Sequence, residues 1–127
     1  MKANDLQVGG SHYQTSKVQH WDLISEMGTL YLIGCATKYV SRWRKKNGRE
    51  DLEKALHYVS KLEEVLMAGQ VGLPDEKPNL HDFVCWVFEA DLTRDEAEIC
   101  SLLLYANGRL DIELAARKLV ELLNDAG

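Results

Sequence analysis

The chain has 127 residues, of which 46% are hydrophobic and 28% are charged, and its formal net charge is −5. These values are ordinary for a globular protein and predict one domain, or one domain with a small helical extension, that buries a core without disulfides. No apolar run approaches the ~20 residues of a membrane span, which argues against a membrane protein.

The cysteines and the N-terminus indicate the compartment. Cys35, Cys85 and Cys100 are far apart and form no C-x-x-C pair, so we expect reduced thiols rather than a disulfide framework or a zinc knuckle. The run from Met1 to Asp5 lacks the apolar stretch of a signal peptide. We therefore expect a cytoplasmic protein.

The net charge is divided unevenly along the chain. Residues 1–68 hold ten Lys and Arg against eight Asp and Glu, a balance of +2, whereas residues 69–127 hold five against twelve, a balance of −7. A surface that binds DNA in general is basic, so the acidic half makes nucleic acid an unexpected partner.

The first half of the chain predicts an extended arm followed by two helices. Residues 1–20 are polar and contain Gly9-Gly10, and a short helical piece from Trp21 to Met27 stops at Gly28. Apolar residues at helical spacing then predict helices over about 30–45 and 50–67, joined by a turn at Gly48. Because so short a connection makes two long helices pack antiparallel, we expect an αα-hairpin.

The second half predicts a linker and three shorter helices. Residues 69–79 contain both prolines and two further glycines, which is typical of a linker. Asn79 is placed to cap a helix whose apolar face includes Leu80, Phe83, Val84 and Phe88. Thr93 and Glu96 form a capping-box pattern before the next helix, and Asp111 is placed to cap the last. No strand pattern is evident. The predicted fold is an all-α helical bundle divided into 1–68, 69–79 and 80–127.

Cations recur on one side of each helix of the predicted hairpin. Across an antiparallel pair the two rows converge at one edge, where ammonium, guanidinium and hydroxyl groups suit the oxygens of a phosphate. An equally general interpretation is a solvated charged face. The row on the first helix consists of Lys38, Arg42 and Lys45. The row on the second consists of Lys54 and Lys61 with Asp51 and Tyr58 on the same side.

A second candidate segment lies in the arm, where Gly9-Gly10 is followed by Ser11, His12 and Tyr13. Paired glycines let backbone N–H groups approach an anion, and an aromatic side chain can stack on a base. A flexible N-terminal turn explains the same residues. The four histidines lack metal-ligand spacing, so we expect no metal site, and a Walker-type phosphate loop is absent.

The first half resembles a small phage and prophage family of largely unknown function. The resemblance covers about residues 8 to 66. It rests on His12-Tyr13, then Gln19-x-Trp21, then Lys38-Tyr39-x-x-Arg42, then Lys46-x-Gly48-x-x-Asp51-Leu52-x-Lys54-Ala55-x-x-Tyr58. Some members are described as phage nucleotide kinases that transfer phosphate to deoxynucleoside monophosphates. The chain departs from the family at Gly34-Cys35, where members usually have Gly-Asn.

The resemblance implies a phage-type nucleotide-binding protein in the host-cell cytoplasm, with nucleotide kinase as the expected activity. No resident cofactor is expected, and a kinase would use a nucleotide phosphate donor. A homo-oligomer is expected, because a chain this small makes a shallow pocket. Two alternatives stay open: a non-catalytic module that sequesters nucleotides or nucleotide signals, and an adaptor that binds a host protein. The expected catalytic residues are His12, Arg42 and Lys54, and the expected ligand-binding residues are Ser11, Tyr13, Lys38, Tyr39, Lys46 and Tyr58.

Overall fold

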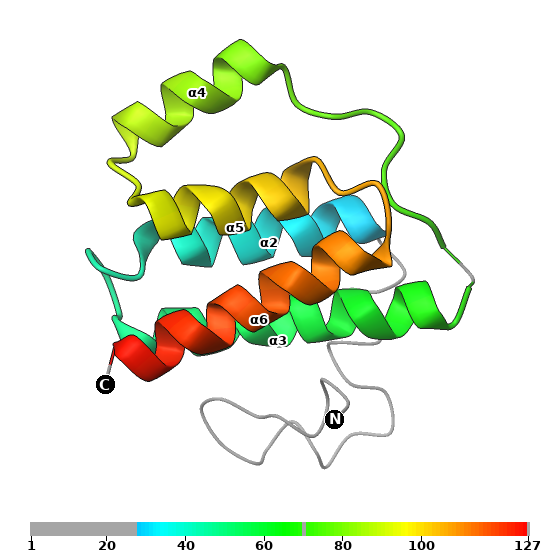
Figure 1. Cartoon of the computed structure of the whole chain (residues 1–127), viewed down its shortest axis with the longest axis horizontal. Helices are drawn as coiled ribbons and strands as arrows, with labels where there is room; N and C mark the ends of the chain where they lie inside the picture. Colours follow the sequence, from blue (N-terminus) through cyan, green and yellow to red (C-terminus); the bar gives the residue numbers. More distant parts are fainter. Residues whose placement is uncertain (1–27, 70, 127) are drawn as a thin grey trace.

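In the computed structural model, which describes residues 28–69 and 71–126, helices are the only regular secondary structure of the described part of the chain (Figure 1). The expected arm, with Ser11, His12, Tyr13 and the short piece before Gly28, lies outside the described residues. The helices are α2 (Thr29–Arg42), α3 (Arg49–Met67), α4 (Leu80–Glu89), α5 (Arg94–Leu104) and α6 (Arg109–Asp125). The predicted bundle is confirmed, although α6, with 17 residues, is longer than α2 with 14.

Four of the helices share one hydrophobic core. Helices α2 and α3 form the antiparallel hairpin, and α5 and α6 pack against it (Figure 1). Fully buried side chains come from both halves of the sequence, so α5 and α6 complete the core of the hairpin rather than extend it. The core includes Leu32, Val40, Leu52, Val59, Leu62, Ile99, Leu103, Ile112 and Leu119.

The turn between α2 and α3 ends the first helix earlier than predicted. Helix α2 stops at Arg42, whose carbonyl accepts hydrogen bonds from the backbone N–H groups of both Lys45 and Lys46, each at 3.0 Å. The N–H of Gly48 donates to the carbonyl of Trp43 at 2.8 Å. Gly48 has φ 62°, a conformation that side chains with a Cβ disfavour, which explains the glycine.

The predicted caps are correct at two helices and wrong at one. The Asn79 side chain accepts from the N–H of Asp82, and Thr93 with Glu96 forms the capping box of α5. Helix α6 begins at Arg109, two residues before the expected cap. Asp111 lies in its first turn and accepts instead from the N–H of Asn107 at 2.9 Å, because a carboxylate there reaches back to the turn.

A buried carboxylate, Glu96, adds polar contacts between the two halves of the chain. Glu96 is 1% exposed and accepts hydrogen bonds from Trp43 Nε1 at 2.6 Å and from Arg44 Nε at 2.8 Å. A second bond from the Arg44 guanidinium, at 3.0 Å, makes the pair bidentate. Burial raises the pKa of Glu96, but the bonds from Arg44, Thr93 and Trp43 outweigh burial and hold that pKa below its ordinary value. The hairpin turn is thereby fastened to the start of α5.

Helix α4 departs most from the prediction. None of its ten residues is buried, and Leu80, Val84 and Phe88, expected in its core face, are 67%, 44% and 80% exposed. It lies on the outer side of α5, away from α3 (Figure 1). Phe83 and Trp86 are partly buried against the core, and the Phe83 ring makes an edge-on contact with Tyr105 at 5.5 Å between ring centroids.

Candidate functional site

The candidate site is a cluster of tyrosines and cations on the α2–α3 hairpin. The rings of Tyr39, from α2, and Tyr58, from α3, are stacked with their centroids 5.9 Å apart and an angle of 17° between their planes. Both side chains are half-buried. Stacking across the hairpin fixes their orientation, because each ring comes from a different helix.

Three cations surround the ring of Tyr39. The Arg42 guanidinium carbon lies 4.7 Å from the ring centroid, and the ammonium nitrogens of Lys38 and Lys54 lie 5.5 Å and 5.6 Å from it. A ring face attracts cations within about 6 Å, so Tyr39 helps to hold the three charges together. We name Lys38, Tyr39, Arg42, Lys54 and Tyr58 the tyrosine–cation cluster.

Two of these cations are also paired with carboxylates. Arg42 Nε lies 3.4 Å from Asp51 Oδ2, an ion pair without hydrogen-bond geometry, and Asp51 is fully buried. Lys54 Nζ lies 3.8 Å from Glu50 Oε1 on the same helix. Among the described residues, Lys38 has no carboxylate within ion-pair distance, so it carries the least compensated charge of the cluster.

Asp51 stays ionised beneath the cluster. Burial raises the pKa of this carboxyl, but hydrogen bonds from the backbone N–H of Asn47 at 3.2 Å and from its side-chain amide at 3.4 Å lower it again. Arg42 adds a second lowering contribution, and the net pKa is below the ordinary value. A carboxylate held this way is a weak base, so its role is to position Arg42.

Tyr58 of the cluster and the nearby Tyr31 keep their protons. Burial, together with the neighbouring Cys35 and Tyr39, raises the pKa of Tyr58 well above its ordinary value. The contact with Cys35 likewise raises the pKa of Tyr31, one turn before Cys35 on α2. At neutral pH the phenols are therefore neutral hydrogen-bonding groups. The proximity of Cys35 to these two phenols has no signal in the sequence.

The remaining predicted site residues do not join the cluster. Lys46 is exposed in the turn after α2, and no side-chain contact places it beside Tyr39. Lys45 donates to the carbonyl of Ala90 at 3.3 Å and so faces the second half of the chain. Ser11, His12 and Tyr13 lie outside the described residues, and the expected catalytic role of His12 stays a prediction.

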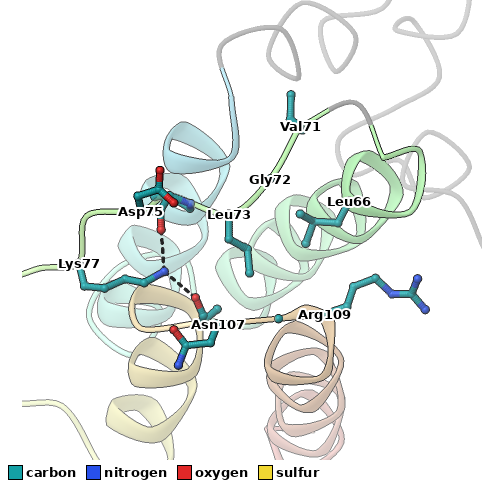
Figure 2. A pocket seen from close by; sticks show the side chains of 11 residues that line it. Leu66, Val71, Gly72, Leu73, Asp75, Lys77, Asn107 and Arg109 are labelled. Atoms are coloured by element: carbon teal, nitrogen blue, oxygen red, sulfur yellow. Dashed lines mark hydrogen bonds between the residues drawn. The ribbon is translucent and has the colours of Figure 1, made fainter.

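A pocket of about 470 Å³ lies at another part of the fold, between the linker and the α5–α6 turn (Figure 2). Its Lys77 ammonium donates to the carbonyls of Pro74 and Ala106, at 2.7 Å and 2.6 Å. Arg109, at its rim, pairs with Glu113 at 3.5 Å. Two of the three N–H donors of Lys77 are used by backbone carbonyls, and Arg109 has a carboxylate partner. The hairpin cluster gathers three cations around one ring, and one of them, Lys38, has no carboxylate partner among the described residues, so the cluster is the stronger candidate.

The described residues contain no group of three His, Cys, Asp or Glu side chains arranged to hold a metal ion. Nor is any helix within residues 28–69 and 71–126 long and apolar enough to cross a membrane.

Residues 8–60 match DUF3310, a family described as proteins of unknown function. The matched segment includes every residue of the tyrosine–cation cluster and ends within α3. No curated protein and no solved structure matches the chain.

Proposed function

We propose that the chain binds a nucleotide, or another phosphorylated small molecule, at the tyrosine–cation cluster. The observation that carries the proposal is the gathering of Lys38, Arg42 and Lys54 within 4.7 to 5.6 Å of one tyrosine ring. Charged donors converging on one point suit phosphate oxygens, and the neighbouring phenols supply neutral hydrogen bonds.

Nucleotide kinase is the activity that we propose first, on the resemblance to phage nucleotide kinases. In that reaction the bond between the γ-phosphorus of a nucleoside triphosphate and its bridging oxygen breaks, and a phosphate oxygen of a nucleoside monophosphate forms the new bond to phosphorus. The products are two nucleoside diphosphates. Cations contribute to such a transfer mainly by positioning and by stabilising charge on the transferring group.

A non-catalytic binding module is the second candidate, and the two ion pairs favour it. Arg42 and Lys54 already share their charge with Asp51 and Glu50. An anion can be bound by the positive charge that remains on the cluster while both ion pairs stay intact. Transfer needs these cations to move onto the reacting phosphate, which weakens both pairs.

Calorimetric titration with nucleoside mono- and triphosphates tests the binding. Lys38→Ala and Lys54→Ala should each weaken binding by about 1.5–3 kcal/mol, the scale of a charged hydrogen bond. Lys118→Ala is the matched control, because Lys118 lies on α6 and pairs with Glu98 at 3.0 Å. Equal affinity of all three variants, or no binding by the full chain, would contradict the proposal.

Arg42→Ala needs a second measurement. This substitution removes the ion-pair partner of the buried carboxylate of Asp51, so it lowers stability as well as affinity. Melting must therefore be recorded beside binding, and Arg42→Lys, which keeps the charge, separates a lost contact from lost stability. Phosphorus NMR of a mono- and triphosphate mixture, with and without Mg²⁺, then distinguishes the two candidates: diphosphates formed by the full chain identify a kinase, and binding without turnover identifies the module.

A further inference from the structure

Two of the three tyrosines on the hairpin have rings that are already occupied. Tyr39 and Tyr58 stack on each other at 5.9 Å between centroids, and the Arg42 guanidinium carbon lies 4.7 Å from the centroid of Tyr39. Both tyrosines are half-buried. A nucleobase that packed on the Tyr39 ring would compete with these contacts. The tyrosine–cation cluster therefore offers charge and hydroxyl groups, but little open ring surface.

The third tyrosine of the hairpin, Tyr31, has the open ring. It is 40% exposed, and it lies on α2 one turn before Cys35. Its side chain contacts Cys35, which also contacts Tyr58, so the thiol joins the Tyr31 ring to the cluster. A tyrosine side chain has only two rotatable angles, and this contact restricts them further. A flat ligand that packs on Tyr31 therefore costs little conformational entropy.

Tyr31 is aligned along α2 with two cations of the cluster. At about 100° per residue, Lys38 and Arg42 lie about 20° to either side of Tyr31 around the helix. At about 1.5 Å per residue they lie about 10.5 Å and about 16.5 Å further along it. The row thus begins with an exposed ring and continues with positive charge. A nucleotide has the same order, with a flat base at one end and phosphate groups at the other.

We infer that Tyr31 is the base-contacting residue of the proposed site, so that a nucleobase packs on its ring while the phosphates lie at Lys38 and the other cations of the cluster. The inference rests on the proposed function and narrows it, because a phosphorylated molecule without a flat ring gains nothing from Tyr31. Every base has a π-face, so stacking tolerates any base. The site should therefore distinguish nucleotides from other phosphates better than it distinguishes one base from another.

Calorimetric titration of the full chain with two ligands separates the ring contact from the charge contact. The ligands are a nucleoside triphosphate and inorganic tripolyphosphate, which has the same phosphate chain without sugar and base. Tripolyphosphate carries at least as much negative charge, so charge alone would make it bind at least as tightly. We expect the nucleotide to bind about tenfold more tightly, which is the scale on which one stacked base contributes.

Single variants assign the contact. Tyr31→Ala should weaken nucleotide binding about tenfold and leave tripolyphosphate binding within about twofold, whereas Tyr31→Phe, which keeps the ring, should bind both within about threefold of the parent chain. Lys38→Ala should weaken both ligands, because both present phosphate oxygens. Leu30→Ala is the matched control, since Leu30 is the preceding residue of α2, is 66% exposed and lies about 100° around the helix from Tyr31, so neither affinity should change.

Nuclear magnetic resonance of a tyrosine-labelled chain gives a readout that does not depend on affinity. The Tyr31 ring resonance is identified as the one that is missing from Tyr31→Phe. A base stacked on this ring should shift the resonance upfield through its ring current, and tripolyphosphate should not.

The inference is overturned if Tyr31→Ala binds the nucleotide like the parent chain, if it weakens both ligands equally, if Leu30→Ala has the same effect, or if the nucleotide leaves the Tyr31 resonance in place. Failure of the proposed function looks different. A full chain that binds neither ligand refutes the phosphate site and the base contact together, whereas a full chain that binds both ligands equally keeps the phosphate site and refutes the base contact alone.

Discussion

Replacing Glu96 with alanine should destabilise the protein more than any surface substitution. The side chain is 1% exposed and accepts from Trp43, from both donor positions of Arg44 and from the N–H of Thr93. Alanine removes this acceptor from all of these donors, and only the Arg44 Nη2 group keeps another partner, the carbonyl of Asp91 at 2.6 Å. Removing one partner of a buried ion pair costs about 3–5 kcal/mol.

The structure favours the lower end of that range. The Arg44 side chain is 34% exposed, so water can partly solvate its guanidinium once Glu96 is gone. We expect a loss of about 3 kcal/mol in the free energy of unfolding, which for a chain of this size lowers Tm by about 12 °C. Urea unfolding followed by tryptophan fluorescence measures the loss. Glu98→Gln, which alters an exposed pair with Lys118, is the control and should change the midpoint little.

The pH dependence of unfolding gives an independent check. Because the folded-state pKa of Glu96 is lowered, its stabilising contribution is fully present above the ordinary glutamate pKa and is lost as the pH falls through the folded value. The parent chain should therefore lose more stability on acidification than Glu96→Gln does. A Glu96→Ala variant that unfolds within about 1 kcal/mol of the parent would refute the reasoning, since that is the range of a surface pair.

Three further outcomes follow from the core. Leu62→Ala, at a fully buried position, should cost about 2–5 kcal/mol in chemical denaturation, and a smaller loss would mean that the core collapses around the cavity. Burial raises the pKa of the Cys100 thiol to about 12, so at pH 8 alkylating reagents should modify Cys100 last among the described cysteines and react quickly only in urea. A chain truncated after Met67 should lose cooperative melting, because α6 packs on α3 and α5 on α2, and the buried residues of all four helices form one core. A cooperatively folded fragment would contradict the single core.

Local patterns in the sequence predicted the helices well. Apolar spacing located α3 to within one residue of each end, and the signals at Asn79 and Thr93 marked true helix starts. These features depend on groups a few residues apart, whose interactions are the same in any fold. The prediction that Asp111 caps the last helix was wrong, because α6 begins at Arg109 and Asp111 lies in its first turn.

The candidate site was predictable in part. Lys38, Arg42, Lys54 and Tyr58 were recognised because helical periodicity puts them on matching sides of two antiparallel helices. Periodicity does not give the distances. Tyr39 as the centre of three cations, and Asp51 buried beneath Arg42, follow from the depth at which the two helices pack.

The sequence by itself determined which residues form helices and which halves carry which charge. Only the tertiary structure decided that Glu96 fastens Trp43 and Arg44, because partners 52 and 53 positions apart meet only when α5 packs on the hairpin. The exposure of α4 was likewise decided by the tertiary structure, because the apolar residues of this helix predict a buried face from the sequence. Burial depends on what lies opposite a helix, and within this chain nothing among the described residues covers Leu80 and Phe88.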